Sequence, residues 1–376
     1  MPGQEAKYQQ VIDWVKQNIE NGTFRKGDRL MSENEMSEHF GLSRQTIRRA
    51  TGELENQKLV TRVRGSGTYI GDGIPTERTV SVMPAVREAH RNIAVISTFN
   101  ESYIFPAILK GIGSVMTREG YSMQVTFTDN RLYLEEAILR LILEKDDIDG
   151  LIVEPVKSAL PNPNIRYYQQ IQERGIPVMF FNAFYPELQV PCVRIDDARA
   201  AFQATQILLD AGHEKIGAIF KSDDGQGPLR YKGYMEAMKQ GGARADQESV
   251  VWLDSPASAA MERIADYVFG RLSGCTGIVC YNDLIAYDLI QLAMDRGMRI
   301  PEDLSVVGID DSYLAGVCKV PFSSVVHPKE RLGELAARNL VRLIREPGFE
   351  AGCLMETQPV LRESVAQIEH KSQRGL

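Results

Sequence analysis

The sequence predicts a small α+β domain at the N-terminus, followed by a larger α/β domain of parallel sheets flanked by helices. The chain has 376 residues, more than a single hydrophobic core usually serves. Residues 1–71 carry short helical patterns and a hairpin pattern, whereas apolar segments alternate with amphipathic ones from residue 92 onward. Residues 72–91 hold two prolines and no sustained periodicity, so we expect a linker between the two domains.

The composition, 43% hydrophobic and 25% charged residues, is typical of a folded globular protein. Its apolar runs are too short to span a bilayer, and the first residues lack the basic start and apolar stretch of a signal peptide. The five cysteines include no C-x-x-C pair, and the five histidines are dispersed. We therefore expect a cytoplasmic protein with no membrane partner, no metal and no cofactor.

The first domain should contain three helices. Apolar residues recur at helical spacing between Tyr8 and Ile19. Ser32 and Glu35 form a capping-box pattern, in which the serine hydroxyl and the glutamate each satisfy a free N–H of the first turn. After a tight turn, Ser43 can cap a third helix that buries Ile47, Ala50 and Leu54.

A β-hairpin is expected after the third helix. Two short β-runs, 59–64 and 68–70, flank the glycine-rich tip 65–67. Two helices joined by a tight turn and followed by a hairpin make a winged helix-turn-helix. The chain carries a net charge of −7, yet residues 43–68 hold six basic residues against two acidic ones, as expected for a surface that binds DNA. The alternative is a small helical subdomain with solvated arginines.

Residues 7–70 resemble the DNA-binding domain of the gluconate-repressor (GntR) family. The resemblance rests on residues 30–33, 40–50 and 64–68, and Met31 stands where the family usually has proline. It implies that the third helix enters the major groove, where an arginine can bond both O6 and N7 of guanine. The DNA contacts that it implies are Asn34, Ser43, Arg44, Gln45, Thr46, Arg48, Arg64 and Gly65.

The second domain should contain parallel sheets covered on both faces, because continuous apolar strands alternate with amphipathic helices. About 270 residues suit two such sheets, one in each of two lobes, and a (β/α)8 barrel is the alternative. The expected strands are 93–97, 123–127, 150–153, 178–181, 216–220, 278–280 and 306–309. The expected helices are 106–118, 133–144, 199–211, 229–240, 258–271 and 284–296.

Most of residues 91–363 resemble the effector-binding domain of the lactose/galactose repressor family, which is similar to periplasmic sugar-binding proteins. The matching stretches are 148–153, 209–217, 230–234, 280–283 and 300–311. The resemblance implies two lobes within residues 92–376: lobe one at about 92–183 and 325–346, and lobe two at about 184–324 and 351–363. A GntR-type DNA-binding domain joined to this effector-binding domain is typical of the arabinose repressors. Residues 103–106, 154–160 and 220–227 resemble that group specifically.

Polar side chains follow several of the expected strands: Glu154, Asn182, Lys221, Asn282 and Asp310. Ligands of parallel sheets bind beyond the carboxyl ends of the strands, and sugars need paired donors and acceptors. The resemblance makes Arg230, Asn282 and Asp310 the firmest sugar contacts. Tyr103 and Phe105 could pack on the sugar ring. Each residue also has a structural interpretation: Asp310 as a turn cap, Asn282 as a helix start, Glu154 as a solvated ion pair, and the aromatic pair as core.

The chain carries no nucleophile-elbow or phosphate-loop motif, so we expect no catalytic residues. A sugar-processing enzyme and a transport binding protein are the alternatives, and the second would need a secretory signal. The sequence and its resemblances together predict a dimeric transcriptional repressor of arabinose utilisation genes. We expect its partners to be operator DNA and a sugar effector, most readily L-arabinose, with another pentose or hexose as the alternative.

Overall fold

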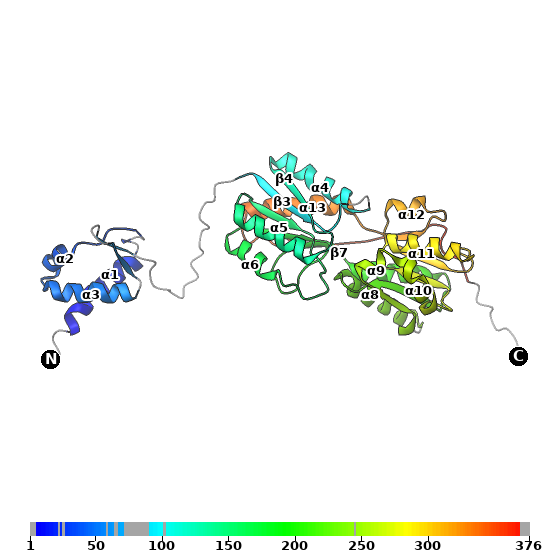
Figure 1. Cartoon of the computed structure of the whole chain (residues 1–376), viewed down its shortest axis with the longest axis horizontal. Helices are drawn as coiled ribbons and strands as arrows, with labels where there is room; N and C mark the ends of the chain where they lie inside the picture. Colours follow the sequence, from blue (N-terminus) through cyan, green and yellow to red (C-terminus); the bar gives the residue numbers. More distant parts are fainter. Residues whose placement is uncertain are drawn as a thin grey trace. The chain divides into compact units, whose positions relative to one another are not determined.

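The computed structural model describes residues 5–21, 23–24, 27–57, 59–63, 67–70, 90–100, 103–243 and 246–368. The chain divides into two compact units, Met1–Met83 and Pro84–Leu376 (Figure 1). Among the described residues, no helix is both long enough and apolar enough to cross a membrane.

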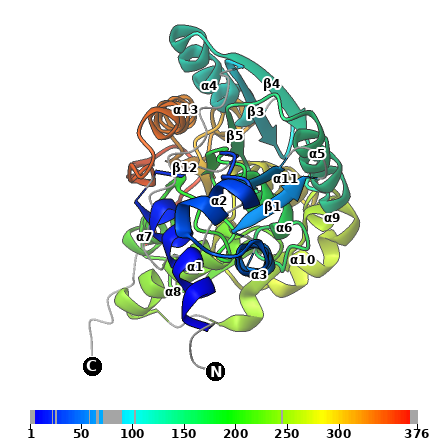
Figure 2. The same ribbon diagram turned by 90° about the vertical axis from the view of Figure 1, so that its left-hand side faces the viewer.

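The N-terminal unit is built of three helices and a hairpin (Figure 2). Their bounds are α1 Glu5–Glu20, α2 Glu33–Phe40, α3 Arg44–Asn56, β1 Val60–Val63 and β2 Gly67–Ile70. Val11 and Val15 of α1, Met36 of α2, and Ile47 and Leu54 of α3 are fully buried together. One apolar stripe from each helix thus forms the core, which leaves the opposite face of α3 free.

Local caps fix both the start of α2 and the tight turn between α2 and α3. Ser32 Oγ accepts from the Glu35 N–H at 3.3 Å, and Glu35 Oε2 accepts from the Ser32 N–H at 2.7 Å, which confirms the predicted capping box. Gly41 ends α2 in the left-handed conformation at φ 64°, where a side chain would be strained. Ser43 then accepts from the Thr46 N–H at 3.2 Å and starts α3.

The hairpin pairs β1 and β2 antiparallel, with Val60 opposite Ile70 and Arg62 opposite Thr68. Arg29 adds a bridge to Tyr69, which ties the hairpin to the segment before α2. The winged helix-turn-helix architecture is therefore confirmed. The tip residues Arg64, Gly65 and Ser66 lie outside the described residues, as does most of the expected linker 72–91.

Lobe one of the second unit contains a six-stranded parallel sheet in the order β13-β7-β6-β5-β3-β4. Its strands are β3 Asn92–Ser97, β4 Ser122–Phe127, β5 Gly150–Val153, β6 Val178–Phe181, β7 Cys192–Ile195 and β13 Cys353–Met355. Its helices are α4 Phe105–Glu119, α5 Leu132–Lys145, α6 Ile165–Glu173 and α13 Lys329–Arg345. The helices α4 and α13 lie side by side (Figure 1).

The contact between α4 and α13 requires glycine in both helices. A Cβ on Gly111 would collide with the backbone carbonyl of Glu330, and a Cβ on Gly333 would collide with that of Ile108. The two backbones therefore touch, and Ile108, Ile112 and Leu332 become fully buried around the crossing.

Lobe two contains a second six-stranded sheet in the order β14-β12-β11-β10-β8-β9, parallel except for β14. Its strands are β8 Ile216–Lys221, β9 Val250–Leu253, β10 Gly277–Cys280, β11 Ser305–Asp310, β12 Ser323–Val326 and β14 Pro359–Val360. Its helices are α7 Asp197–Asp210, α8 Gln226–Gln240, α9 Ser255–Ser258, α10 Ala265–Arg271, α11 Asp283–Asp295 and α12 Tyr313–Val317. Two separate sheets confirm the predicted fold class and exclude the barrel.

The chain passes between the lobes three times, at residues 196, 327–328 and 356–358. The expected lobe boundaries need correction at three places. Residues 192–195 and 353–355, expected in lobe two, form β7 and β13 at the edge of the lobe-one sheet. Residues 325–326, expected in lobe one, end β12 in the lobe-two sheet. The physical reason is that each strand completes its sheet before the chain crosses. The expected helix 258–271 is also interrupted, because Ala260 leaves the helical region at φ −134°.

Candidate functional site

A cleft of about 1010 Å³ is lined by residues of both lobes. The predicted ligand residues all line it, although they come from positions 103 to 310 of the chain. They are Tyr103, Phe105, Glu154, Asn182, Lys221, Arg230, Asn282 and Asp310. Parallel strands explain this convergence, because β5, β6, β8, β10 and β11 end with their carboxyl ends toward the same space.

Arg230 is held rigidly at the base of the cleft. It is 2% exposed; its Nε lies 2.9 Å from Asp197 Oδ1, and its Nη1 donates to the Tyr281 carbonyl. Its Nη2 lies 3.7 Å from Asp310 Oδ1, beyond hydrogen-bond distance. Burial opposes the charge of Arg230, but Asp197 and Asp310 outweigh it and raise the pKa of the guanidinium. One edge of the guanidinium is therefore left to bond a ligand.

Asp310 faces Arg230 and also lobe one. It ends β11 in the left-handed region at φ 116°, and its Oδ2 accepts from the Tyr103 hydroxyl at 2.5 Å. Its Oδ1 is buried without a hydrogen-bond partner among the described residues. Burial raises the pKa of Asp310, and Arg230 opposes that rise. A ligand hydroxyl placed between Arg230 Nη2 and Asp310 Oδ1 would satisfy both groups.

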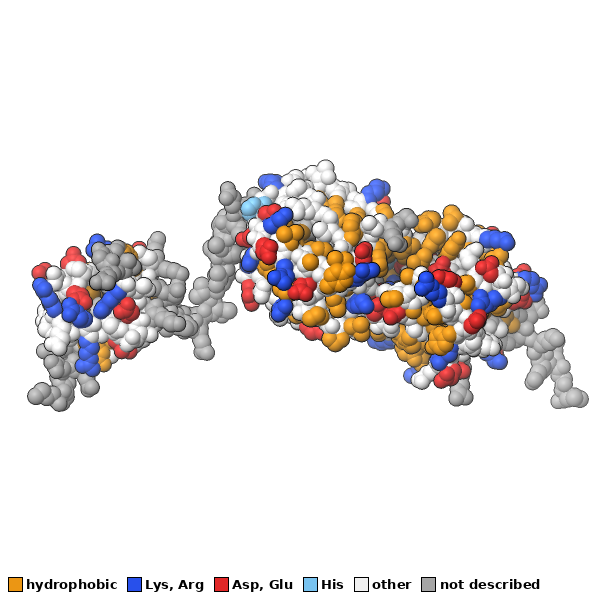
Figure 3. Space-filling model, in the orientation of Figure 1, with side chains coloured by type: hydrophobic (Ala, Val, Ile, Leu, Met, Phe, Trp, Pro, Cys, Tyr) orange, Lys and Arg blue, Asp and Glu red, His pale blue; other side chains and the backbone are white. Residues whose placement is uncertain are grey.

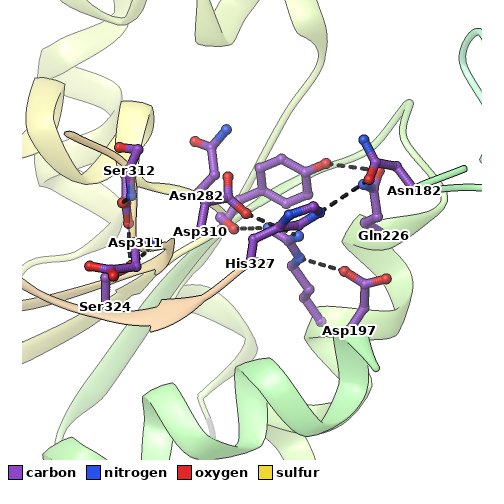
Figure 4. A network of polar contacts seen from close by, with 12 residues as sticks. Asn182, Asp197, Gln226, Asn282, Asp310, Asp311, Ser312, Ser324 and His327 are labelled. Carbon is purple, nitrogen blue, oxygen red and sulfur yellow. Dashed lines mark hydrogen bonds and ion pairs between the residues drawn. The ribbon is translucent and has the colours of Figure 1, made fainter. Parts of the chain in front are cut away.

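A chain of hydrogen bonds runs from Thr98 to His327. Glu154 Oε2 accepts from the Thr98 N–H at 3.0 Å and from its hydroxyl at 2.5 Å, while Asn182 Nδ2 donates to Glu154 Oε1 at 2.7 Å. Asn182 Oδ1 then lies 3.1 Å from His327 Nε2 (Figure 4). Because an amide oxygen only accepts, Nε2 carries the proton and Nδ1 does not. Burial lowers the pKa of His327 to about 3, so the ring is neutral.

Lys221 and Asn282 are less free than the sequence suggested. Lys221 Nζ donates to Asp224 Oδ2 at 2.6 Å, and the hydroxyl of Tyr281 shares that oxygen at 3.3 Å. Asn282 caps α11, because its Oδ1 accepts from the Ile285 N–H at 3.0 Å. The alternative interpretation of Asn282 as a helix start thus applies together with its place in the cleft.

The aromatic residues line the cleft as half-buried side chains. Phe105 starts α4, and its ring centroid lies 5.6 Å from that of Phe99. Tyr103 offers a polar hydroxyl to lobe two, as described above, and packs at the margin of the core.

Several lining residues were missed from sequence. Thr98 directly follows a predicted strand, so its position was readable, whereas His327 follows β12, a strand whose Ser-Ser-Val-Val sequence gives only a weak signal. Within the described parts of the chain, no group of three metal-ligating side chains forms. The cleft combines acceptors, donors and aromatic surface, an arrangement suited to a neutral polyhydroxyl ligand.

The second candidate site lies on the N-terminal unit. Asn34, Ser43, Arg44, Gln45 and Arg48 are exposed, and Thr46 is half-buried. On the face that Figure 3 shows, Lys and Arg side chains reach the surface of this unit. Arg64 and Gly65, also predicted DNA contacts, lie outside the described residues.

Among the described arginines of this unit, Arg48 and Arg62 have polar partners, and Arg49 lies over the ring of Tyr8. Arg48 Nη2 lies 2.9 Å from Glu33 Oε2, and its Nε is within 3.3 Å of both carboxylate oxygens. Arg62 Nη2 donates to Thr51 Oγ1 at 2.5 Å and thereby ties the hairpin to α3. Arg44 and Gln45, at the start of α3, are the exposed groups best placed to reach base edges.

Two known families match the chain. Residues 7–70 match the bacterial regulatory proteins of the gntR family, and residues 205–365 match the periplasmic binding protein-like domain. The arabinose metabolism transcriptional repressor of Halalkalibacterium halodurans is 36% identical over 99% of each chain. The protein of the same name from Geobacillus stearothermophilus is 30% identical over 96% of each chain.

Solved structures of transcription regulators share the fold. The CelR–cellobiose complex matches with a TM-score of 0.64 and 26% identity, covering 85% of this chain and 90% of that one. CcpA of Lactococcus lactis matches with a TM-score of 0.64 and 25% identity, covering 73% of this chain and 98% of that one. The relatives are regulators of transcription rather than enzymes.

Proposed function

The chain belongs to the arabinose metabolism transcriptional repressors, and from this premise we propose that L-arabinose is the effector that releases it from its operator. The observation that carries the proposal is the convergence of the eight predicted ligand residues on one cleft between the lobes. Both carboxylates and both cations of this set offset one another in charge, which suits a neutral sugar better than a sugar phosphate.

In the proposed site, Arg230 and Asp310 hold adjacent hydroxyls of the sugar, with Glu154, Asn182, Lys221 and Asn282 around them. Tyr103 and Phe105 border the ring. On the DNA side, Arg44, Gln45 and the other predicted residues of α2, α3 and the wing contact the operator. The linker 72–91 transmits closure of the lobes to the reader domain. We place the protein in the cytoplasm, where operator DNA is.

Release requires that the sugar bind the DNA-incompetent state more tightly than the DNA-bound state. By thermodynamic reciprocity, operator DNA must then weaken sugar binding by the same factor. Measuring the sugar affinity with and without operator therefore tests the coupling independently of any variant.

The decisive experiment is a fluorescence-anisotropy titration on an operator that the protein itself selects from a random DNA library. L-arabinose should dissociate the wild-type complex, and Asp310→Ala should bind the operator normally but resist release. Asp266→Ala, which removes a fully exposed carboxylate of lobe two, is the matched control. The assignment of effector and site fails if L-arabinose tightens DNA binding. It also fails if L-arabinose releases Asp310→Ala from the operator as readily as it releases the wild type. Calorimetry with other pentoses and hexoses decides between L-arabinose and the alternative sugars.

We also propose that the protein is a homodimer, because two reader domains would match a pseudo-palindromic operator. A fragment of residues 91–376 should remain dimeric in analytical ultracentrifugation, bind the sugar and lose specific DNA binding. A monomeric fragment would place dimerisation in the N-terminal unit and contradict this account of signal transfer.

A further inference from the structure

The two sheets have a hinge edge and a far edge. The strands beside the crossovers, β7 with β13 and β12 with β14, lie at one edge of their sheets, whereas β4 and β9 lie at the opposite edges. Rotation of the lobes about the crossovers moves the far edges most. Contacts near the far edge, between the loops that follow β4 and β5 in lobe one and β8 and β9 in lobe two, are therefore among those that lobe opening must break.

Such contacts exist, and six residues make them: Asn130, Ser158 and Ala159 of lobe one, and Asp223, Gly225 and Ser255 of lobe two. We call these six residues the clasp. Asn130 Nδ2 donates to Ser255 Oγ at 2.8 Å, and the Gly225 N–H donates to Ser158 Oγ at 2.9 Å. The Ala159 N–H donates to the Asp223 carbonyl at 3.3 Å. Asn130, Ser158 and Asp223 are at most 8% exposed, so these bonds are shielded from water.

Asn130 has a fixed orientation within the clasp. Its Oδ1 accepts from the Lys157 N–H at 2.9 Å inside lobe one, which leaves Nδ2 as the group directed across to lobe two. The same Nδ2 lies 3.4 Å from Asp224 Oδ1, and Asp224 Oδ2 bonds Lys221 of the cleft. Closure of the clasp is thus connected to a proposed ligand residue through one carboxylate.

The clasp also gives a role to two segments, 154–160 and 220–227, that the ligand contacts account for only in part. Ser158 and Ala159 belong to the first, Asp223 and Gly225 to the second. The two segments meet through one bond from backbone to side chain and one between backbones. Asn130 and Ser255 also line the cleft, whereas Ser158, Ala159, Asp223 and Gly225 do not, and none of the six needs to touch the sugar for these bonds to form.

We propose that the clasp closes the far edge of the cleft over the bound effector and sets the rate at which the effector leaves. Asn130, Ser158 and Ser255 are positioning residues in this role. The proposal rests on the proposed function for the identity of the effector, but not for the existence of the clasp.

The test compares the full-length wild type with the double variant Ser158→Ala/Ser255→Ala, which removes one acceptor from each lobe and leaves the backbone unchanged. The matched control is Ser122→Ala/Ser273→Ala, two serines outside the clasp that lie near the amino ends of strands. Stopped-flow fluorescence follows L-arabinose release through Trp252, at the end of β9; the other tryptophan, Trp14, lies in the N-terminal unit. Hydrogen exchange of peptides containing Ala159 and Gly225 follows the clasp without any ligand.

The clasp variant should release L-arabinose about tenfold faster, since it loses two hydrogen bonds of the closed state. Hydrogen exchange at Gly225 should be faster in the clasp variant than in the control. The urea midpoints of the two proteins should be equal, which excludes a general loss of structure as the cause. Equal release rates in the variant and the control would overturn the proposal. If calorimetry shows that the wild type does not bind L-arabinose, the effector assignment fails, and the exchange then decides alone: faster exchange supports the clasp, and unchanged exchange refutes it.

Discussion

The hydroxyl of Tyr103 lies 2.5 Å from Asp310 Oδ2 and joins the two lobes across the cleft. The same hydroxyl accepts from the Asp283 N–H at 3.1 Å, so it contacts two strand ends of lobe two. Burial raises the pKa of Tyr103 well above its ordinary value, and the phenol remains a donor. Tyr103 therefore acts at the cleft through its hydroxyl, as well as packing against the core.

Tyr103→Phe should weaken L-arabinose binding by about 1–2 kcal/mol, because the closed form loses this bond and leaves Asp310 Oδ2 unpaired. Isothermal titration calorimetry at fixed salt measures the change. Tyr121→Phe, a half-buried tyrosine of lobe one with no side-chain hydrogen bond among the described residues, is the control. An unchanged affinity in Tyr103→Phe would show that the bond does not stabilise the closed form.

Arg230→Ala should cost about 3–5 kcal/mol of stability in the second unit, because it leaves the buried carboxylates of Asp197 and Asp310 uncompensated. Asp197→Asn in the same chain should recover part of the loss, since it removes one of the stranded charges. Urea unfolding of residues 91–376 gives the three free energies. A double variant no more stable than Arg230→Ala would contradict this electrostatic account.

Arg44→Ala should weaken operator binding by about 1–3 kcal/mol and leave sugar affinity unchanged, since Arg44 lies exposed at the start of α3. Lys16→Ala, which removes one positive charge from α1, controls for charge alone. Anisotropy at several salt concentrations separates a base contact from a phosphate contact. If Arg44→Ala and Lys16→Ala weaken operator binding equally, Arg44 makes no base contact and α3 does not lie in the major groove.

The stability of the second unit should fall as pH rises from 6.5 to 8. Burial, together with the charge of Asp310, raises the pKa of Asp283 from 3.8 to about 8. As pH rises, Asp283 therefore loses its proton in the unfolded chain before it does so in the folded chain. The free energy of unfolding that Asp283 contributes is complete below pH 3.8 and is lost as pH rises through 8. The lowered pKa of His327 affects stability only below pH 6.5. Asp283→Asn should flatten the slope, at most about 1.4 kcal/mol per pH unit; identical urea-unfolding slopes would contradict the assignment.

The sequence predicted the elements whose signal is local. The Ser32 capping box, the seven apolar strands and the polar residues after them are written in neighbouring positions. The strand β7, Cys-Val-Arg-Ile, has four residues, of which only two are buried, which is why the sequence does not reveal its place in lobe one. Helix α13 could have been predicted, because Leu332, Ala336 and Leu340 recur at helical spacing.

Pairings between distant side chains could not be predicted. Glu33 meets Arg48 across 15 positions, and Asp197 meets Arg230 across 33, because tertiary packing alone brings these groups together. For the same reason, residue types at strand ends indicated a polar cleft but not which of its groups are already occupied by neighbours. Asp224 is such a case, because Tyr281, 57 positions away, shares the carboxylate oxygen that Lys221 bonds.

Lobe one obtains α13 and β13 from the far end of the chain, after all of lobe two except its edge strand β14. During synthesis, the part of α4 that packs on α13, around Ile108 and Gly111, therefore stays uncovered until residue 345 has left the ribosome. The N-terminal unit, complete by residue 83, can fold long before that. A nascent chain stopped between residues 196 and 329 thus carries a finished reader domain attached to an uncovered, aggregation-prone surface, which makes full-length translation a condition for lobe one to fold.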